Sequence, residues 1–313
     1  MVAVVIPCYK VKKHILDVIS RIGSEVGKIY VVDDCCPENS GKFVLENCTD
    51  PRIVVLYNEK NKGVGGAVIA GYQQALKDGA TIIVKLDGDG QMDPSQIGKL
   101  IAPILNKEAD YTKGNRFFDL EKLLVMPKLR LIGNSILSLV NKTVNGYWNI
   151  VDPTNGFTAV HAKALELIPL KKVSNRFFFE SDMLFRLSTI RAVVKDIPMP
   201  PIYGETKSNL KIGRVLFSFP FKYLNRFFKR LFYNYILRDF NAGSIQLFTG
   251  TILLVIGLAY GIYHWIISYE TMIASPTGTV MIPALLVILG FQSLLGALNF
   301  DVQNIPTTPL QNI

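Results

Sequence analysis

Three carboxylates and two glycines lie within the ten-residue stretch KLDGDGQMDP, directly after the apolar run TIIV. An Asp-x-Asp pair alone is usually a solvated turn, but Asp87 and Asp89 stand at the end of a predicted buried strand. They offer carboxylate oxygens of the kind that Mg²⁺ takes as ligands beside substrate phosphates. The third carboxylate, Asp93, precedes Pro94 and is expected to cap the next helix. The stretch therefore predicts a metal and diphosphate site followed by a helix.

Two further kinds of residue are suited to phosphate. The segment NKGVGGA, with Lys62 and Gly63, opens a predicted helix, and a glycine-rich helix N-terminus can hold phosphate. It matches neither GxGxxG nor a P-loop, so a tight turn explains these glycines equally well. Arg116 in GNRF and Arg130 in KLRLIGN can each bind phosphate in a bidentate way. Taken singly, each arginine is more simply a surface charge.

Alternating apolar runs and helical patterns must position these residues. Strands are predicted at 2–7, 29–34, 53–57 and 81–87, with helices at 11–24, 39–48, 64–78 and 95–107. This alternation predicts an α/β fold with a parallel sheet and right-handed crossovers. Ligands of such sheets bind beyond the carboxyl ends of the strands. The polar residues expected there are Pro7, Tyr9, Asp33, Asp34, Asp87 and Asp89.

The composition points to a membrane. The chain of 313 residues is 49% hydrophobic, and its mean hydropathy is +0.27. Residues 244–267 and 280–300 contain no Asp, Glu, Lys or Arg, and each is long enough to cross a hydrocarbon core of about 30 Å as a helix. A pair of buried core helices is the less favoured alternative. We therefore expect two transmembrane helices.

Basic residues predict the orientation of these spans. Eight Lys and Arg residues and no acid lie between Lys207 and Arg238, and no Lys or Arg follows Arg238. The positive-inside rule then predicts a multi-pass protein of the cytoplasmic (inner) membrane, with the N-terminal part and the 301–313 tail in the cytoplasm. A basic amphipathic helix at 219–238 is expected to lie in the interface, against anionic lipid. The cations expected on one of its faces are Lys222, Arg226, Lys229 and Arg230.

Other ligands are disfavoured. The net charge of +9 is concentrated beside the spans, and no nucleic-acid motif accompanies it, so lipid headgroups are the expected partner rather than nucleic acid. The four cysteines form no CxxC pair and the three histidines are scattered, so no structural zinc is expected.

The motifs in their order resemble family 2 glycosyltransferases of the GT-A fold. They are VVIPCYK, VVDDCCPENSG, NKGVGGAVIAGYQQAL, DGDGQMDP, GNRF, PTNGF, ESDMLFRL and GETKS. The likeness covers residues 1–240 and is greatest to polyprenyl-phosphate glycosyltransferases of the dolichyl-phosphate mannose synthase and bacterial undecaprenyl-phosphate glucosyltransferase type. It implies a Rossmann-like catalytic domain at 1–210, interfacial helices at 211–242, two transmembrane helices within 243–300 and a tail at 301–313.

The resemblance also implies roles for single residues. Pro7, Tyr9, Asp33 and Asp34 would hold the nucleoside, and Lys62, Gly63, Asp87 and Lys207 complete the nucleotide-sugar site. Asp87, Asp89 and Gln91 would bind the metal. Arg116 and Arg130 would hold an acceptor phosphate beside Asn134. Asp182 corresponds to the acid of the acceptor-side motif, so the catalytic set is Asp89, Asp182, Arg116 and Arg130.

The implied reaction is inverting, metal-dependent transfer of a hexose from a nucleotide sugar, UDP-linked by expectation, to a polyprenyl phosphate. The alternative enzyme adds the sugar to a hydroxyl of a lipid-linked oligosaccharide or polysaccharide. A phosphate acceptor is already a nucleophile, whereas a hydroxyl needs a base such as Asp182. A non-catalytic membrane scaffold is a third possibility, against which the intact acidic trio argues. The residues DDCC and Thr158 depart from the family pattern, so the identities of the nucleotide and the sugar stay open. Whether the protein forms a homo-oligomer also stays open.

Overall fold

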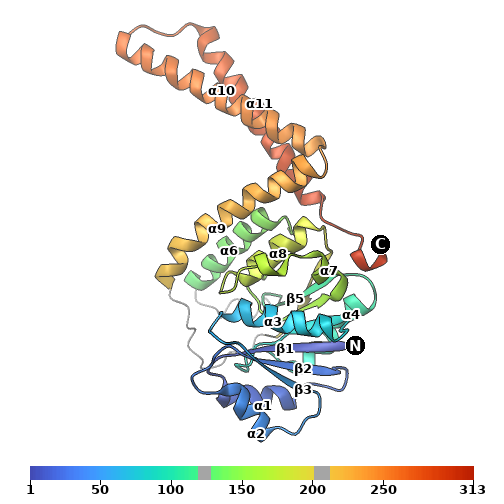
Figure 1. Ribbon diagram of the computed structural model, residues 1–313. Helices are drawn as coiled ribbons and strands as arrows, with labels where there is room; N and C mark the ends of the chain where they lie inside the picture. The colour runs from blue at the N-terminus through green and yellow to red at the C-terminus, as the bar shows by residue number, and fades with distance from the viewer. Residues whose placement is uncertain (119–127, 201–211) are drawn as a thin grey trace. The chain divides into compact units, whose positions relative to one another are not determined.

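The structure, a computed structural model, describes residues 1–118, 128–200 and 212–313 (Figure 1). The predicted loop residue Lys207 lies outside the described residues. The chain forms two compact units. One comprises Met1–Phe227 together with Pro306–Ile313, and the other is Phe228–Ile305. The C-terminal residues thus belong to the same compact unit as the N-terminal sheet.

The first unit is built on a seven-stranded sheet with the order β3-β2-β1-β4-β6-β5-β7. The four N-terminal strands run parallel, as the sequence predicts. The prediction of a parallel sheet fails at β6, which runs antiparallel to both β4 and β5. Alternation along the chain reveals that a strand exists but not its direction, because direction depends on long-range pairing. The strands are β1 (Val2–Cys8), β2 (Lys28–Asp33), β3 (Ile53–Tyr57), β4 (Ile82–Lys85), β5 (Tyr111–Asn115), β6 (Thr158–His161) and β7 (Val194–Pro198).

Helices cover both faces of this sheet, which explains why its central strands are apolar on both sides. Helices α1 and α2 lie on one side of β1–β3 and α3 lies on the other (Figure 1). The helices of the first unit are α1 (Lys12–Ser20), α2 (Ser40–Asn47), α3 (Val64–Lys77), α4 (Ile97–Leu105), α6 (Lys128–Asn145), α7 (Ala162–Leu167), α8 (Phe179–Thr189) and most of α9 (Ile212–Phe232), with short turns of 3₁₀ helix at η1 (Pro94–Gln96), η2 (Leu170–Lys172) and η4 (Leu310–Asn312).

The close approach of α3 to the sheet depends on Gly71. A Cβ added there would lie 2.3 Å from Cγ1 of Val5 and 3.2 Å from Cγ2 of Val32. Only a residue without a side chain lets the helix axis come this near to the strands. Helix α3 begins after Gly63, so this packing also positions the glycine-rich loop NKGVGGA that precedes the helix.

The second unit is a pair of long apolar helices, α10 (Ala242–Thr271) and α11 (Thr277–Gln303), preceded by the π-helical turn η3 (Tyr233–Leu237). Each contains an 18-residue stretch of high mean hydropathy, 1.9 in α10 and 2.1 in α11, so by length and composition both can cross a membrane. The predicted spans, 244–267 and 280–300, lie inside these helices.

Glycines bring α10 and α11 together. A Cβ at Gly250 would lie 2.9 Å from the carbonyl oxygen of Gly290. Small residues at such contacts let helices approach closely where lipid surrounds them. At the ends of the pair, Arg230 donates to Asp301 at 2.7 Å, and the hydroxyl of Tyr235 also bonds to Asp301. One of the cations expected to meet lipid, Arg230, is therefore engaged with a carboxylate of its own unit.

The C-terminal segment returns to the first unit and binds at Asp110, a fully buried residue at the start of β5. The backbone amides of Leu310 and Gln311 donate to the Asp110 carboxylate at 3.0 and 3.3 Å. The side-chain amide of Gln311 donates to the carbonyl oxygens of Ile104 and Ala109 at 3.0 and 2.9 Å. The chain therefore leaves and re-enters the same compact unit, with the two apolar helices in between.

Candidate active site

A cavity of about 210 Å³ opens at the edge of the sheet where three strands end. The antiparallel pairing of β6 creates it, because Lys85 at the end of β4 pairs with Thr158 at the start of β6. The turn before β6 is thereby placed beside the acidic loop after β4. Residues after β5 and β7 complete the walls, which consist of Asp87, Gln91, Met92, Asp93, Gln96, Arg116, Thr154, Asn155, Gly156, Phe157, Met199 and Pro200.

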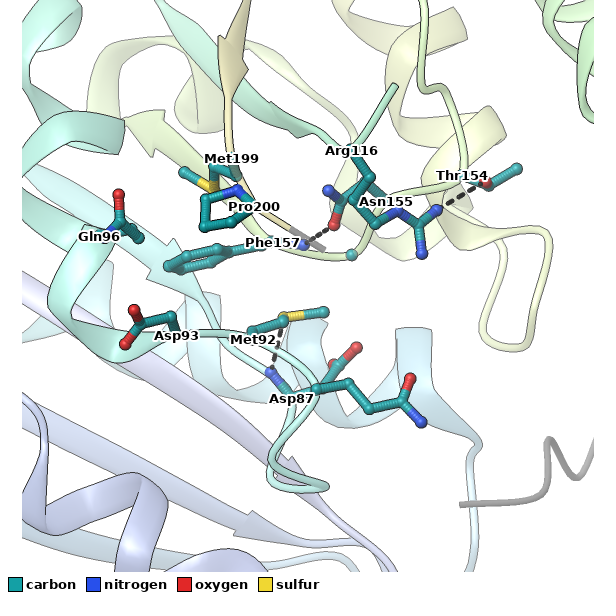
Figure 2. Close-up of a pocket in the computed structure, with 12 residues that line it drawn as sticks. Asp87, Met92, Asp93, Gln96, Arg116, Thr154, Asn155, Phe157, Met199 and Pro200 are labelled. Carbon is teal, nitrogen blue, oxygen red and sulfur yellow. Dashed lines mark hydrogen bonds between the residues drawn. The ribbon is translucent and has the colours of Figure 1, made fainter. Parts of the chain in front are cut away.

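The acidic loop forms one side of this cavity (Figure 2). Asp87 and Gln91 line it, and the backbone amide of Gln91 donates to Oδ1 of Asp89 at 3.0 Å. The prediction for the third carboxylate is confirmed: Asp93 accepts from the amide of Ser95 at 3.1 Å, with Pro94 in the first helical position. Asp93 also pairs with Arg21 at 2.6 Å. The loop thus contains a pair of acids and, separately, a helix cap.

The acidic pair suits a hard divalent cation. Burial raises the pKa of Asp89, and the negative charge of Asp87 adds to this effect. A cation bound to both carboxylates would remove that penalty, and their oxygen donors are those that Mg²⁺ and Mn²⁺ prefer. Within the described residues no group of three or more His, Cys, Asp or Glu side chains is placed to hold a metal. Two carboxylates leave coordination positions for phosphate oxygens of a substrate.

Arg116 lies on the other side of the cavity, and Figure 2 shows it across from Asp87 and Met92. Its Nε donates to Oδ2 of Asp152 at 2.7 Å and its Nη2 to Oδ1 at 3.1 Å. Asp152 is fully buried, so this bidentate pair fixes the guanidinium plane. The Arg116 side chain is still 38% exposed. A pre-oriented, partly exposed arginine at a cavity wall is well suited to bind an anion.

The second predicted arginine is less defined. Arg130 lies in the first turn of α6, and Asn134 follows one turn later on the same helix. The structure does not describe the side chain of Arg130. The pairing of Arg116 and Arg130 on one phosphate therefore remains a prediction.

Asp33 and Asp34, expected to hold a nucleoside, organise the loops after β2. Asp33 accepts from the amides of Cys36 and Gly41, both at 2.7 Å. Asp34 accepts from the amides of Lys62 and Gly63 at 2.9 and 2.7 Å. Both carboxylates are 3% exposed. Asp33 thus holds the loop after β2, and Asp34 joins that loop to the glycine-rich loop before α3.

Backbone conformation explains one glycine of that loop. Gly63 has a φ of +84°, and a Cβ there would lie 2.8 Å from the carbonyl oxygen of Asn175. The tight-turn interpretation of the segment is therefore supported, and contact with phosphate is a separate prediction. At the end of β1, Pro7 is half-buried and Tyr9 is 42% exposed, so the Tyr9 ring is accessible to a ligand.

Asp182 does not line the cavity. Its carboxylate is fully buried in α8 and accepts from Nε of Arg226 at 2.6 Å and from the amide and hydroxyl of Ser174 at 2.8 and 3.0 Å. A second cation expected to meet lipid, Arg226, is thus engaged with a carboxylate. In this arrangement Asp182 ties α9 to α8, and its role in catalysis stays a prediction.

Several residues near the site were not assigned a role from the sequence. Lys85 is fully buried below the acidic loop, where its Nζ lies 2.7 Å from Oδ1 of Asp87 and 3.4 Å from Oε1 of Glu180. Burial alone lowers its pKa, but the charges of Asp87 and Glu180 outweigh burial and raise the pKa of Lys85. Asp152, the partner of Arg116, was also missed. In the sequence, Lys85 is recognisable only as a charged residue in an otherwise apolar strand, and Asp152 only as a charged residue at a turn.

The fold identifies the structural class of the protein. The chain resembles the crystal structure of glucosyl-3-phosphoglycerate synthase from Mycobacterium tuberculosis in complex with Mn²⁺, UDP and glucosyl-3-phosphoglycerate. The TM-score is 0.54 at 15% identity, covering 74% of this chain and 79% of that one. At this identity the likeness shows the fold alone, which is the α/β GT-A fold.

Sequence comparison then specifies the family. The family model "Glycosyl transferase family 2" matches residues 3–168. A relative from Methanococcus voltae, UDP-N-acetylglucosamine–dolichyl-phosphate N-acetylglucosaminyltransferase, is 28% identical over 69% of this chain and 93% of its own length. Undecaprenyl-phosphate mannosyltransferase of Micrococcus luteus is also 28% identical, over 69% of this chain and 89% of its own length. The chain belongs to glycosyl transferase family 2 and is a glycosyltransferase.

Proposed function

We propose that this glycosyltransferase moves a hexose from a nucleotide sugar, expected to be UDP-linked, to a polyprenyl phosphate at the cytoplasmic face of the membrane. The observation that carries the proposal is that one cavity is lined by both Asp87 and the pre-oriented Arg116. Two anionic reactants that must meet require positive charge on both. Relatives whose names specify undecaprenyl, polyprenol or dolichyl phosphate acceptors support the choice of acceptor.

Asp87, Asp89 and Gln91 would hold a divalent cation together with the donor diphosphate. When bound, Mg²⁺ or Mn²⁺ would neutralise the charge that builds up on the departing diphosphate. The crystallised M. tuberculosis enzyme with Mn²⁺ and UDP has the same fold, which supports a metal of this kind. Lys62 and Gly63 are proposed to border the donor through the loop that Asp34 holds. Lys207 stays a proposed donor residue outside the described part of the chain.

Arg116 is proposed to bind and orient the acceptor phosphate. An oxygen of this phosphate forms a bond to the anomeric carbon, and the bond from that carbon to the donor diphosphate breaks. The electron pair leaves with the nucleoside diphosphate, and in-line attack inverts the anomeric configuration. A phosphate monoester has a second pKa of about 6 and is mostly dianionic near neutral pH, so no protein base is needed. The engagement of Asp182 with Arg226 and Ser174 is consistent with this.

The membrane arrangement is part of the proposal. Two helices that can each cross a membrane connect the catalytic unit to a C-terminal segment bound at Asp110 of that same unit. If the helix pair crosses the membrane twice, both of its ends lie on the same side of the membrane, as this connection requires. With the basic residues that precede the spans, this supports a multi-pass hairpin with the catalytic unit in the cytoplasm.

The test uses the full-length chain in detergent with undecaprenyl phosphate, Mg²⁺ or Mn²⁺ and a panel of labelled UDP- and GDP-sugars. We expect one donor to give an organic-extractable lipid-linked sugar, and chelation by EDTA to abolish the product. Asp89→Asn is expected to lower turnover by about 10²-fold or more. Asp17→Asn, which changes an exposed carboxylate that does not line the cavity, is the matched control and is expected to stay near the wild-type rate.

The absence of an extractable product with every donor would refute the proposal. A product that forms only when a lipid-linked saccharide replaces the polyprenyl phosphate would instead favour the hydroxyl acceptor. Full cellular function of an Asp89→Ala strain would favour the scaffold.

A further inference from the structure

The buried ammonium group of Lys85 joins three separate parts of the active site. Its Nζ donates to Oδ1 of Asp87 at 2.7 Å and to the carbonyl oxygen of Gly156 at 3.2 Å, and it lies 3.4 Å from Oε1 of Glu180. These groups come from the acidic loop, the turn before β6 and the start of α8. The Lys85 side chain is 1% exposed, so it does not contact substrate directly.

A buried ammonium costs several kcal/mol of desolvation unless nearby groups compensate for it. Here a carboxylate and a carbonyl at hydrogen-bond distance, with a second carboxylate close by, provide that compensation. The position is also crowded, because a Cβ on Gly156 would lie 2.5 Å from Nζ of Lys85 and 2.8 Å from Oδ2 of Asp87. The ammonium, the metal-site carboxylate and the turn therefore fit one another closely.

A second buried lysine holds the same turn. Lys113 in β5 is also fully buried, and its Nζ donates to the carbonyl oxygen of Asn155. Successive carbonyl groups of one cavity-lining turn thus each accept from a lysine that enters from a different strand. A solvated turn would need no such support, so the arrangement points to a wall whose position matters.

We propose that Lys85 is a positioning residue that acts as a resident cation below the acidic site. It fixes Asp87 and the Asn155–Gly156 turn, and it offsets the charge of Asp87 so that a divalent cation binds weakly until a donor diphosphate supplies further oxygen ligands. Metal and nucleotide are then bound together rather than metal first. This deepens the proposed function and rests on it, since it assumes that Asp87 and Asp89 hold the metal.

The charge of Lys85 predicts the direction of the effect, because an ammonium paired with a metal-site carboxylate repels a cation bound to that carboxylate. Removing the ammonium should therefore strengthen the binding of Mn²⁺ alone by at least about tenfold. Removing a group that orients a metal ligand typically costs about ten- to a hundredfold in activity. Tighter metal binding with slower turnover is a combination that general unfolding does not produce.

The experiment compares Lys85→Met with Gly156→Ala in the full-length protein. An added Cβ in Gly156→Ala displaces Lys85 and Asp87 from the turn without changing any charge. Binding of Mn²⁺ is measured by calorimetry or electron paramagnetic resonance, with and without UDP, and kcat and KM are measured separately. Far-ultraviolet circular dichroism and the melting temperature verify the fold of each variant.

We expect Lys85→Met to bind Mn²⁺ alone about tenfold more tightly than the wild type does, to gain less from added UDP, and to lose at least about tenfold in kcat. Gly156→Ala should lose kcat while its affinity for Mn²⁺ alone stays within about threefold of the wild type. A folded Lys85→Met protein with wild-type Mn²⁺ affinity overturns the proposal. If Lys85→Met does not fold, a wild-type kcat in Gly156→Ala overturns it.

Measurements on the wild-type protein separate a failure of the metal-dependent function from a failure of the proposed role of Lys85. If the wild type binds no Mn²⁺ even with UDP or GDP, the metal-dependent function itself fails, and the role of Lys85 fails with it. If the wild type binds Mn²⁺ with nucleotide and Lys85→Met behaves in the same way, only the role of Lys85 is wrong.

Discussion

The substitution Asp182→Asn separates a structural role of this carboxylate from a catalytic one. Asp182 is fully buried and holds Arg226, whose side chain is 18% exposed, at 2.6 Å. Arg186 lies 3.9 Å from the same carboxylate. The substitution would leave two guanidinium groups facing a neutral amide. If the carboxylate ties α9 to α8, as its contacts indicate, the main effect should be on stability.

The magnitude follows from the burial of the pair. Breaking a buried ion pair by removing one partner typically costs about 3–5 kcal/mol. The partial exposure of Arg226 reduces this, and an asparagine oxygen can still accept from Ser174, so we expect a loss of about 2–3 kcal/mol. For a domain of this size that corresponds to a fall in melting temperature of about 5–10 °C. Turnover measured well below the transition should fall by less than about tenfold, because no base is needed.

The assay uses the two tryptophans of the sequence, Trp148 and Trp265, which lie in different compact units. In a Trp265→Phe background, the fluorescence of Trp148 reports on the catalytic unit alone. The matched control is Asp17→Asn, since Asp17 is exposed and lies 3.9 Å from Arg21. Its loss should cost less than about 0.5 kcal/mol. A double-mutant cycle of Asp182→Asn with Arg226→Met should give a coupling energy of about 2 kcal/mol.

A structural role is refuted if the Asp182→Asn protein melts at the wild-type temperature, binds nucleotide normally and has lost more than about 10²-fold in turnover. Asp182 would then act in the chemistry itself, and a hydroxyl acceptor would become the better hypothesis.

Three further outcomes are expected. Burial lowers the pKa of Lys113 to about 8, so above that pH the folded state binds fewer protons than the unfolded state. The free energy of unfolding should therefore rise by up to about 3 kcal/mol between about pH 8 and 10.5, relative to Lys113→Met. Parallel pH profiles in denaturant titrations would contradict this. Deleting residues 306–313 leaves the buried Asp110 carboxylate with fewer hydrogen-bond donors and should lower the free energy of unfolding by about 1–3 kcal/mol. In an Asp110→Asn background the same deletion should lower it by less. Additive losses of stability would contradict the contact. Gly71→Ala should destabilise the protein by about 1–3 kcal/mol, because the added Cβ would clash with Val5. Gly98→Ala should stabilise it by up to about 1 kcal/mol, because no atom lies within 4 Å of the added Cβ. Melting curves in which both variants behave alike would contradict the role of Gly71 in packing.

Local patterns predicted most of the elements. The apolar runs at 2–7, 29–34, 53–57 and 81–87 became β1–β4, because a strand covered by helices on both faces is recognisable from its own residues. The Asp93-Pro94 cap was predictable for the same reason, since a cap depends on neighbouring residues only. The prediction of the two apolar spans depends only on their length and on the absence of charged residues within them.

Partnerships between distant residues were not predictable in this way. The sequence contained both LDGDGQ and PTNGF, but only the antiparallel pairing of β6 with β4 places them around one cavity. Arg116 was chosen for its chemistry, whereas its orientation depends on Asp152, 36 residues further along the chain. Helical spacing grouped Arg226 and Arg230 as lipid contacts, yet each pairs with a carboxylate more than 40 residues away.

The sequence by itself therefore determined the family, the succession of strands and helices, the acidic pair and the two apolar helices, because each depends on residue types at short spacing. Only the tertiary structure decided what surrounds those residues: the ammonium of Lys85 below Asp87, the anchoring contacts of Asp182 and the return of the C-terminal segment to Asp110. The physical reason is that desolvation and ion pairing depend on distances in space. Those distances follow from strand order and direction, which local periodicity does not specify.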